Sequence, residues 1–77
     1  MKIQILGMGC AKCHKLTAIA MQAADELNLT YEIVKVTEPN DIVNFGVMMT
    51  PAMAVDGAVK VAGKIPTVEE MKKLLQK

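Results

Sequence analysis

The sequence contains no arginine and no tryptophan, and Tyr31 and Phe45 are its only aromatic residues. Recognition of phosphate groups and nucleic-acid bases usually relies on arginine forks and stacking aromatic rings. The nine lysines are scattered along the chain and nearly balanced by eight acids, which leaves a net charge of +1. The composition therefore argues against nucleic acid as a partner.

Long apolar runs are also missing. The longest strictly apolar stretches, 18–21 and 52–55, have four residues, whereas a membrane-spanning helix needs about 20. Lys2 is followed by a short strand-like segment and not by the apolar core and cleavage site of a signal peptide. We therefore expect no membrane partner and a cytoplasmic location. The 77 residues leave room for one domain, 1–77, and we expect a monomer.

Cysteine is scarce, and the two cysteines stand close together. Cys10 and Cys13 form a C-x-x-C motif near the start of the chain. A secreted disulfide scaffold needs more cysteines, spread so that they close longer loops. A bridge between residues three positions apart closes almost no chain, so its entropic contribution to stability would be small. The spacing favours chemistry over structural cross-linking.

Hydrophobic periodicity predicts the element order β-α-β-α-β-β-α. Strands are expected at 3–6, 30–36, 52–55 and 58–61, and helices at 12–27, 38–45 and 67–75. Asp56-Gly57 between two apolar runs is a strong hairpin signal, and Thr67 with Glu70 predicts a capping box. A helical crossover makes the first two strands parallel. The sequence thus predicts an α/β fold with a mixed four-stranded sheet.

The local context predicts different roles for the two cysteines. Cys10 stands at the boundary between a glycine turn and a helix, where unpaired backbone N–H groups favour the reactive thiolate. Cys13 precedes Leu16 on the apolar face of that helix, so we expect it to be more buried. An exposed attacking thiol and a shielded resolving thiol suit disulfide exchange. The only redox group implied is the Cys10–Cys13 disulfide, without another cofactor.

Two other readings of the cysteines remain open at this point. A structural zinc site needs four ligands, and Cys10, Cys13 and His14 are the available set, so such a site would need a second copy of the chain. The cysteines would also be unreactive if they only filled apolar space, as free cysteine often does.

Several motifs together resemble a known family. Gly9-Cys10-Ala11-Lys12-Cys13 follows the first strand, Thr50-Pro51 precedes the third, and Gly63 precedes the last helix. This arrangement is similar to the thioredoxin fold, specifically to the small, glutaredoxin-sized redox-active disulfide proteins, over essentially the whole chain. The resemblance implies exchange with protein disulfides and recycling by a separate reductase.

The resemblance also implies the residues of the site. Cys10 and Cys13 would be catalytic, and a further set would bind the substrate: Gly9, Ala11, Lys12, Thr50, Pro51 and Gly63. In this family the proline before the third strand is cis, so Pro51 is expected to be cis. Thr50 would then offer backbone hydrogen bonds to the substrate chain.

The sequence departs from typical thioredoxins at three points. The tryptophan-glycine-proline context of the motif is missing, which leaves the redox potential open. The strand before the motif, 3–6, has no acid to accept a proton from the resolving thiol, so we expect that transfer to use water. The lack of arginine argues against binding of the glutathione carboxylates.

A soft-metal carrier is the alternative function. Gly7-Met8-Gly9-Cys10-x-x-Cys13 is similar to the loop of heavy-metal-associated domains, in which Cu(I) would be held by Met8, Cys10 and Cys13. Those domains run β-α-β-β-α-β and end in a strand, whereas a final helix is predicted here.

Methionines accompany the other predicted loop of the site. Three of them bracket Thr50-Pro51 and are expected to face the dithiol: Met48, Met49 and Met53. Thioether groups favour Cu(I), but methionine also lines adaptable binding surfaces. The sequence therefore predicts either a metal-binding set or an apolar rim for protein substrates.

Overall fold

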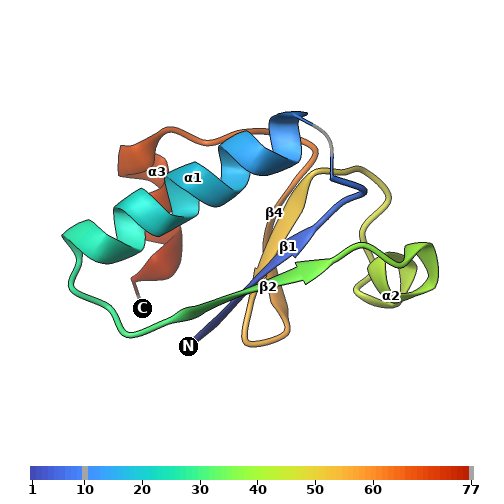
Figure 1. The fold of residues 1–77 in the computed structure, drawn as a ribbon, viewed down its shortest axis with the longest axis horizontal. Helices are drawn as coiled ribbons and strands as arrows, with labels where there is room; N and C mark the ends of the chain where they lie inside the picture. Colours follow the sequence, from blue (N-terminus) through green and yellow to red (C-terminus); the bar gives the residue numbers. More distant parts are fainter. Residues whose placement is uncertain (10, 77) are drawn as a thin grey trace.

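The computed structural model describes residues 1–9 and 11–76 and shows the predicted element order (Figure 1). The strands and helices are β1 (Lys2–Leu6), α1 (Ala11–Glu26), β2 (Glu32–Val36), α2 (Pro39–Asn44), β3 (Ala52–Val55), β4 (Ala58–Ala62) and α3 (Val68–Leu75). The predicted boundaries agree with these to within two residues at most ends. Residues 10 and 77 lie outside the described part of the chain.

The four strands form one mixed sheet in the order β2-β1-β3-β4. β1 and β2 are parallel, with α1 as their crossover, whereas β1–β3 and β3–β4 are antiparallel. The predicted mixed four-stranded sheet is therefore confirmed. β1 lies inside the sheet and leads directly into the loop before α1 (Figure 1), so the C-x-x-C motif follows a strand that is fixed on both sides.

The two faces of the sheet are covered by different helices. Ile3 and Ile5 of β1 belong to a core cluster that also contains residues of α1 and α3, which pack side by side (Figure 1). Leu6 points the other way, as strand alternation requires, and joins a second cluster with Ile42 of α2 and Ala52. The end of β1 that leads to the motif is thus enclosed by helices on both faces.

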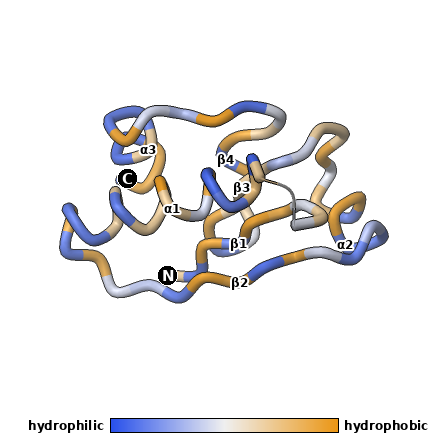
Figure 2. The backbone as a smooth tube through the Cα atoms, turned by 45° about the horizontal axis from the view of Figure 1, so that its top comes forward, coloured by the Kyte–Doolittle hydropathy of each residue, from blue (hydrophilic) through white to orange (hydrophobic). Residues whose placement is uncertain are grey.

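Helix α1 is built for close packing. Three of its buried residues are alanines. The buried residues recur at helical spacing and are Cys13, Leu16, Ala20, Ala23 and Ala24. Small side chains let the helix approach the sheet and α3, and Figure 2 shows hydrophobic and hydrophilic residues alternating along its turns. Asn28, with φ of 56°, adopts a left-handed conformation just after the helix, as is common at helix C-termini.

The Asp56-Gly57 turn joins β3 to β4 as predicted. Both residues are left-handed, with φ of 51° and 88°, which matches the twist of a two-residue hairpin. The Asp56 carboxylate accepts a hydrogen bond from the Lys2 backbone N–H at 2.8 Å, and the Gly57 N–H donates to Gln4 Oε1 at 2.8 Å. These bonds fix the hairpin against β1.

The predicted capping box starts α3. Thr67 Oγ1 accepts a hydrogen bond from the Glu70 backbone N–H at 3.1 Å, and Glu70 Oε1 accepts one from the Thr67 N–H at 3.0 Å. The backbone hydrogen bond lowers the pKa of Glu70 below its ordinary value. Two otherwise unpaired N–H groups are satisfied in this way.

Thr67→Ala is expected to lower the free energy of unfolding by about 1 kcal/mol, because it removes the N-cap acceptor. Urea unfolding of the two proteins measures this loss. Thr67→Ser keeps the hydroxyl and should retain most of the stability. An equal loss in both variants would contradict a capping role for the Thr67 hydroxyl.

Candidate functional site

The first turn of α1 holds one of the two predicted catalytic residues. Cys13 is only 5% exposed, which confirms that it lies on the buried face of the helix. The Thr17 hydroxyl donates a hydrogen bond to the Cys13 carbonyl oxygen at 2.9 Å, so the main chain at Cys13 is held by the next turn. Cys10, the other predicted catalytic residue, lies outside the described residues.

The loop between β1 and α1 passes close to the Cys13 side chain. Gly7 is buried, and its N–H extends the sheet by donating to the Val36 carbonyl at 3.0 Å. Gly9 then adopts φ of 82°, a left-handed conformation that suits glycine. The predicted glycine turn therefore redirects the chain from the sheet into the helix.

A second loop, which contains Thr50 and Pro51, lies close to the loop between β1 and α1. The Thr50–Pro51 peptide bond is cis, and Pro51 is buried at the start of β3. The Gly63 N–H donates to the Pro51 carbonyl at 2.9 Å, which ties the end of β4 to the proline loop. A Cβ built on Gly7 would lie 3.9 Å from Pro51 Cα. The structure thus brings the proline loop and the loop before α1 together.

Gly63 is covered by a neighbouring methionine. It has φ of 76°, and a Cβ built on it would lie 2.9 Å from Met49 Cβ and 3.2 Å from Met49 Sδ. Any side chain at Gly63 would therefore displace Met49, which is itself 63% exposed. The close approach of Met49 to Gly63 was not foreseen, because it joins two loops that are separate in the sequence.

The predicted substrate-binding residues differ in their exposure and in the element to which they belong. Ala11 and Lys12 lie exposed on the first turn of α1, and Thr50 is exposed beside the buried Pro51. Gly63 contacts the proline loop through its hydrogen bond to the Pro51 carbonyl. Together they border the two loops that surround the amino end of α1, so a peptide bound there would contact residues from both.

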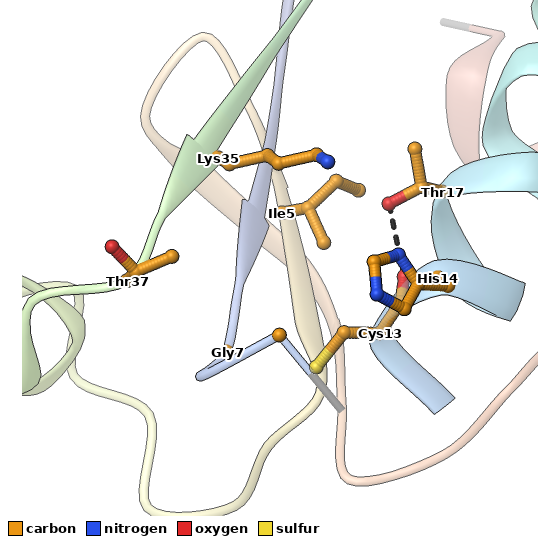
Figure 3. Close-up of a pocket in the computed structure, with 8 residues that line it drawn as sticks. Ile5, Gly7, Cys13, His14, Thr17, Lys35 and Thr37 are labelled. Carbon is orange, nitrogen blue, oxygen red and sulfur yellow. Dashed lines mark hydrogen bonds between the residues drawn. The ribbon is translucent and has the colours of Figure 1, made fainter. Parts of the chain in front are cut away.

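A narrow cavity of about 40 Å³ lies beside Cys13 (Figure 3). The residues that line it come from β1, the following loop, α1 and the end of β2: Ile5, Gly7, Gly9, Cys13, His14, Thr17, Lys35 and Thr37. A cavity needs only about 10–15 Å³ of such volume to hold one water molecule. It is therefore large enough for water next to the buried thiol but too small for a substrate side chain.

The sequence did not point to Lys35 as part of the site. In the parallel register Ile5 lies opposite Lys35, so the lysine belongs to the strand next to the one that leads to the motif. Figure 3 shows its side chain reaching across Ile5 toward Thr17 of α1. Lys35 and Cys13 line the same cavity, and the pairing register of β1 and β2 is the information that the sequence alone did not contain.

A separate, apolar groove of about 460 Å³ is bordered by Thr50 of the proline loop. The described residues that line it are all uncharged: Met8, Pro39, Ile42, Val43, Val47, Met48 and Thr50. Three of these apolar residues are well exposed, with Met48 at 98%, Met8 at 67% and Val43 at 66%. Of the three methionines in the predicted apolar rim, Met48 lines this groove. Met8, which was predicted only as a metal ligand, lines it as well.

Met53 does not belong to this rim. It was expected to face the dithiol together with Met48 and Met49, but its side chain is fully buried in the core cluster between the sheet and α1. The reason is its register opposite Ile5, which directs both side chains to the same face of the sheet.

The soft-metal alternative is not supported. The chain ends in α3 and not in the strand that closes the heavy-metal-associated fold. Cys10, one of the three ligands of that alternative, lies outside the described residues, and Met8 would bind through a thioether. Among the histidine, cysteine, aspartate and glutamate side chains of residues 1–9 and 11–76, no group of three or more could hold a metal ion. In the same ranges no helix is both long and apolar enough to cross a membrane.

Comparison with known proteins agrees with the fold. A family model described as "Thioredoxin domain" matches residues 1–76. A thioredoxin of Methanothermobacter thermautotrophicus is 43% identical over 75 residues, which cover 97% of each chain. A thioredoxin of Methanocaldococcus jannaschii is also 43% identical, over 74 residues that cover 96% of this chain and 85% of that protein.

Proposed function

The chain belongs to the thioredoxin family, and we propose that it is a thiol–disulfide oxidoreductase that acts on protein disulfides through Cys10 and Cys13. The observation that carries this proposal is the position of Cys13. Its side chain is buried in the first turn of α1, next to Gly7 and near the Pro51 loop, and it lines a narrow cavity together with Lys35. Such a thiol suits a reaction inside the protein better than direct attack on a large substrate.

Cys10 would act first. It immediately precedes Ala11, the first residue of α1, in the sequence, and helix N-termini favour a thiolate. Its sulfur would attack one sulfur of a substrate disulfide. This step forms a mixed disulfide between Cys10 and the substrate and releases the other substrate sulfur as a thiolate, which takes up a proton.

Cys13 would resolve the mixed disulfide. After losing its proton, its sulfur attacks the Cys10 sulfur, so that the Cys10–Cys13 disulfide forms and the reduced substrate leaves. β1 contains no acid that could accept this proton, and its Gln4 amide is not a base. The cavity beside Cys13 has room for water and is lined by His14 and Lys35, which supports the predicted proton transfer through water.

Substrate binding would use the two loops and the groove beside them. Thr50 lies exposed next to Pro51 and can offer backbone hydrogen bonds to an extended chain. The groove beside Thr50 is apolar, which supports substrates with apolar residues near the disulfide. Gly9, Ala11, Lys12 and Gly63 remain the predicted border of this region. Recycling by a separate reductase, the monomeric state and the cytoplasmic location stay predictions.

The proposal is tested by two measurements on the full chain. Equilibration with dithiothreitol of known redox ratio should yield one intramolecular Cys10–Cys13 disulfide, and the midpoint gives its potential. The reduced protein should also accelerate the reduction of insulin by dithiothreitol. Failure to form the intramolecular disulfide would contradict the proposal. A Cys10→Ser/Cys13→Ser variant serves as the blank for the insulin assay.

A further inference from the structure

The sulfur of Cys13 lies in the space that a side chain at residue 7 would occupy. A Cβ built on Gly7 would overlap with Cys13 Sγ and would lie 3.7 Å from Cys13 Cβ. Figure 3 shows the Cys13 sulfur directed toward Gly7. Contacts of this kind are essentially never seen between real atoms, so any side chain at residue 7 must displace the sulfur or the strand end.

Backbone conformation does not explain the glycine. Gly9, Gly46, Gly57 and Gly63 have φ between 76° and 88°, where other residues are strained. Gly7 does not belong to this left-handed group. It continues the β1–β2 pairing through its hydrogen bond to Val36. An alanine could adopt the same backbone, so the contact with Cys13 is what requires glycine.

The surroundings leave the sulfur no equivalent alternative. Cys13 is 5% exposed, and Leu16 in the next turn is fully buried. Pro51 also lies near this space, since its Cα would lie 3.9 Å from a Cβ on Gly7. A displaced sulfur would have to enter the small cavity toward His14 and Lys35, away from the proline loop.

We propose that Gly7 is a positioning residue for the resolving step: its missing side chain provides the place from which the Cys13 sulfur attacks the mixed disulfide. This inference rests on the proposed function. Gly7 touches neither substrate nor the bond that forms; it acts only through the position of Cys13 Sγ. The first step, attack by Cys10, does not use that sulfur and should be insensitive to residue 7.

Gly7→Ala should slow the resolving step by about 10- to 100-fold, because displacement of a reacting group by on the order of 1 Å has effects of that size. Rapid mixing of the reduced protein with an oxidised model peptide, followed by acid quench and mass spectrometry, separates the two steps. Formation of the Cys10–peptide disulfide should proceed at the wild-type rate. The mixed disulfide should then persist in Gly7→Ala and disappear quickly in wild type.

Gly57→Ala is the matched control. Gly57 has φ of 88° and no atom within 4 Å of a built Cβ, so its substitution strains the hairpin without touching the site. It should destabilise the protein but leave the lifetime of the mixed disulfide unchanged. A mixed disulfide that persists equally in Gly57→Ala would overturn the proposal, because general destabilisation would then account for the effect.

A stability cycle covers the case in which Gly7→Ala does not fold. Cys13→Ala removes the sulfur, so the added methyl group of Gly7→Ala/Cys13→Ala has room. Its urea midpoint should match that of Cys13→Ala, whereas Gly7→Ala alone should show a clear loss or no folding. If Gly7→Ala lowered stability equally with and without Cys13→Ala, contact with the Cys13 sulfur could not be the cause, and the proposal would be overturned.

The kinetic outcomes also separate this proposal from the function it rests on. If wild type forms no Cys10–peptide disulfide, the oxidoreductase proposal fails and the positioning role fails with it. If wild type and Gly7→Ala both react and resolve at the same rate, only the positioning role is overturned.

Discussion

Cys13→Ser, mixed with an oxidised protein substrate, is expected to accumulate as a covalent complex joined through Cys10. Attack by Cys10 needs no second thiol, but release of the substrate does, and a serine hydroxyl does not displace a thiolate under these conditions. Multiple-turnover reduction of insulin should therefore fall to the blank rate. Non-reducing electrophoresis followed by mass spectrometry measures the complex and identifies the cysteine that joins it.

Cys10→Ser is the matched variant for this trap. Cys13, the remaining cysteine, is only 5% exposed and its sulfur lies against Gly7, so a protein disulfide cannot easily reach it. Little complex should form. Alkylation by iodoacetamide near neutral pH tests the same asymmetry, since Cys10 should react faster. Equal trapping by both variants would show that the roles of the two cysteines are assigned wrongly.

The fold could be predicted from the sequence wherever the signals were local. The Asp56-Gly57 turn and the capping box of Thr67 and Glu70 each depend on a few neighbouring residues. The burial of Cys13 followed from helical periodicity alone. Such features depend little on how distant segments pair, so the order of elements and the mixed sheet could be inferred.

The contacts of the site that the sequence did not predict depend on how distant segments of the chain pair. Lys35 reaches the Cys13 cavity because β2 pairs with β1 in one particular register. In the sequence Gly7 was recognised only as part of the loop after the first strand, although in the structure the Cys13 side chain closely approaches it. Neither spacing nor composition contains the distance between two loops, so these contacts required the three-dimensional structure.

Met53 shows how strand register corrects a reading based on proximity in sequence. Because Met48, Met49 and Met53 stand near Thr50-Pro51, they were expected to act together. β3 begins at Ala52, and alternation along it directs Met53 into the core opposite Ile5 and Val61. The methionines near the proline loop therefore divide into exposed residues of the rim and a buried residue that stabilises the sheet.

Met53→Ala is expected to lower the free energy of unfolding by about 2–5 kcal/mol, the range found when a buried methionine is truncated and leaves a cavity. Met53 is fully buried, and its strand lies between β1 and β4. The surrounding residues therefore cannot easily move in to fill the cavity that the truncation would leave. Single domains are stable by only about 5–15 kcal/mol, and small ones lie at the low end. The loss would therefore be a large share of the total, and urea unfolding measures it.

Two control variants separate the cavity from the chemistry of methionine. Met53→Leu nearly conserves the side-chain volume and should cost less than about 1.5 kcal/mol. Met48→Ala removes the same atoms as Met53→Ala from a side chain that is 98% exposed, and surface substitutions usually stay within about 0.5 kcal/mol. If Met48→Ala and Met53→Ala lowered stability equally, Met53 could not be packed in the core between β3 and α1. A loss confined to Met53→Ala would show that the core position of Met53, and not the methionine side chain as such, accounts for its contribution to stability.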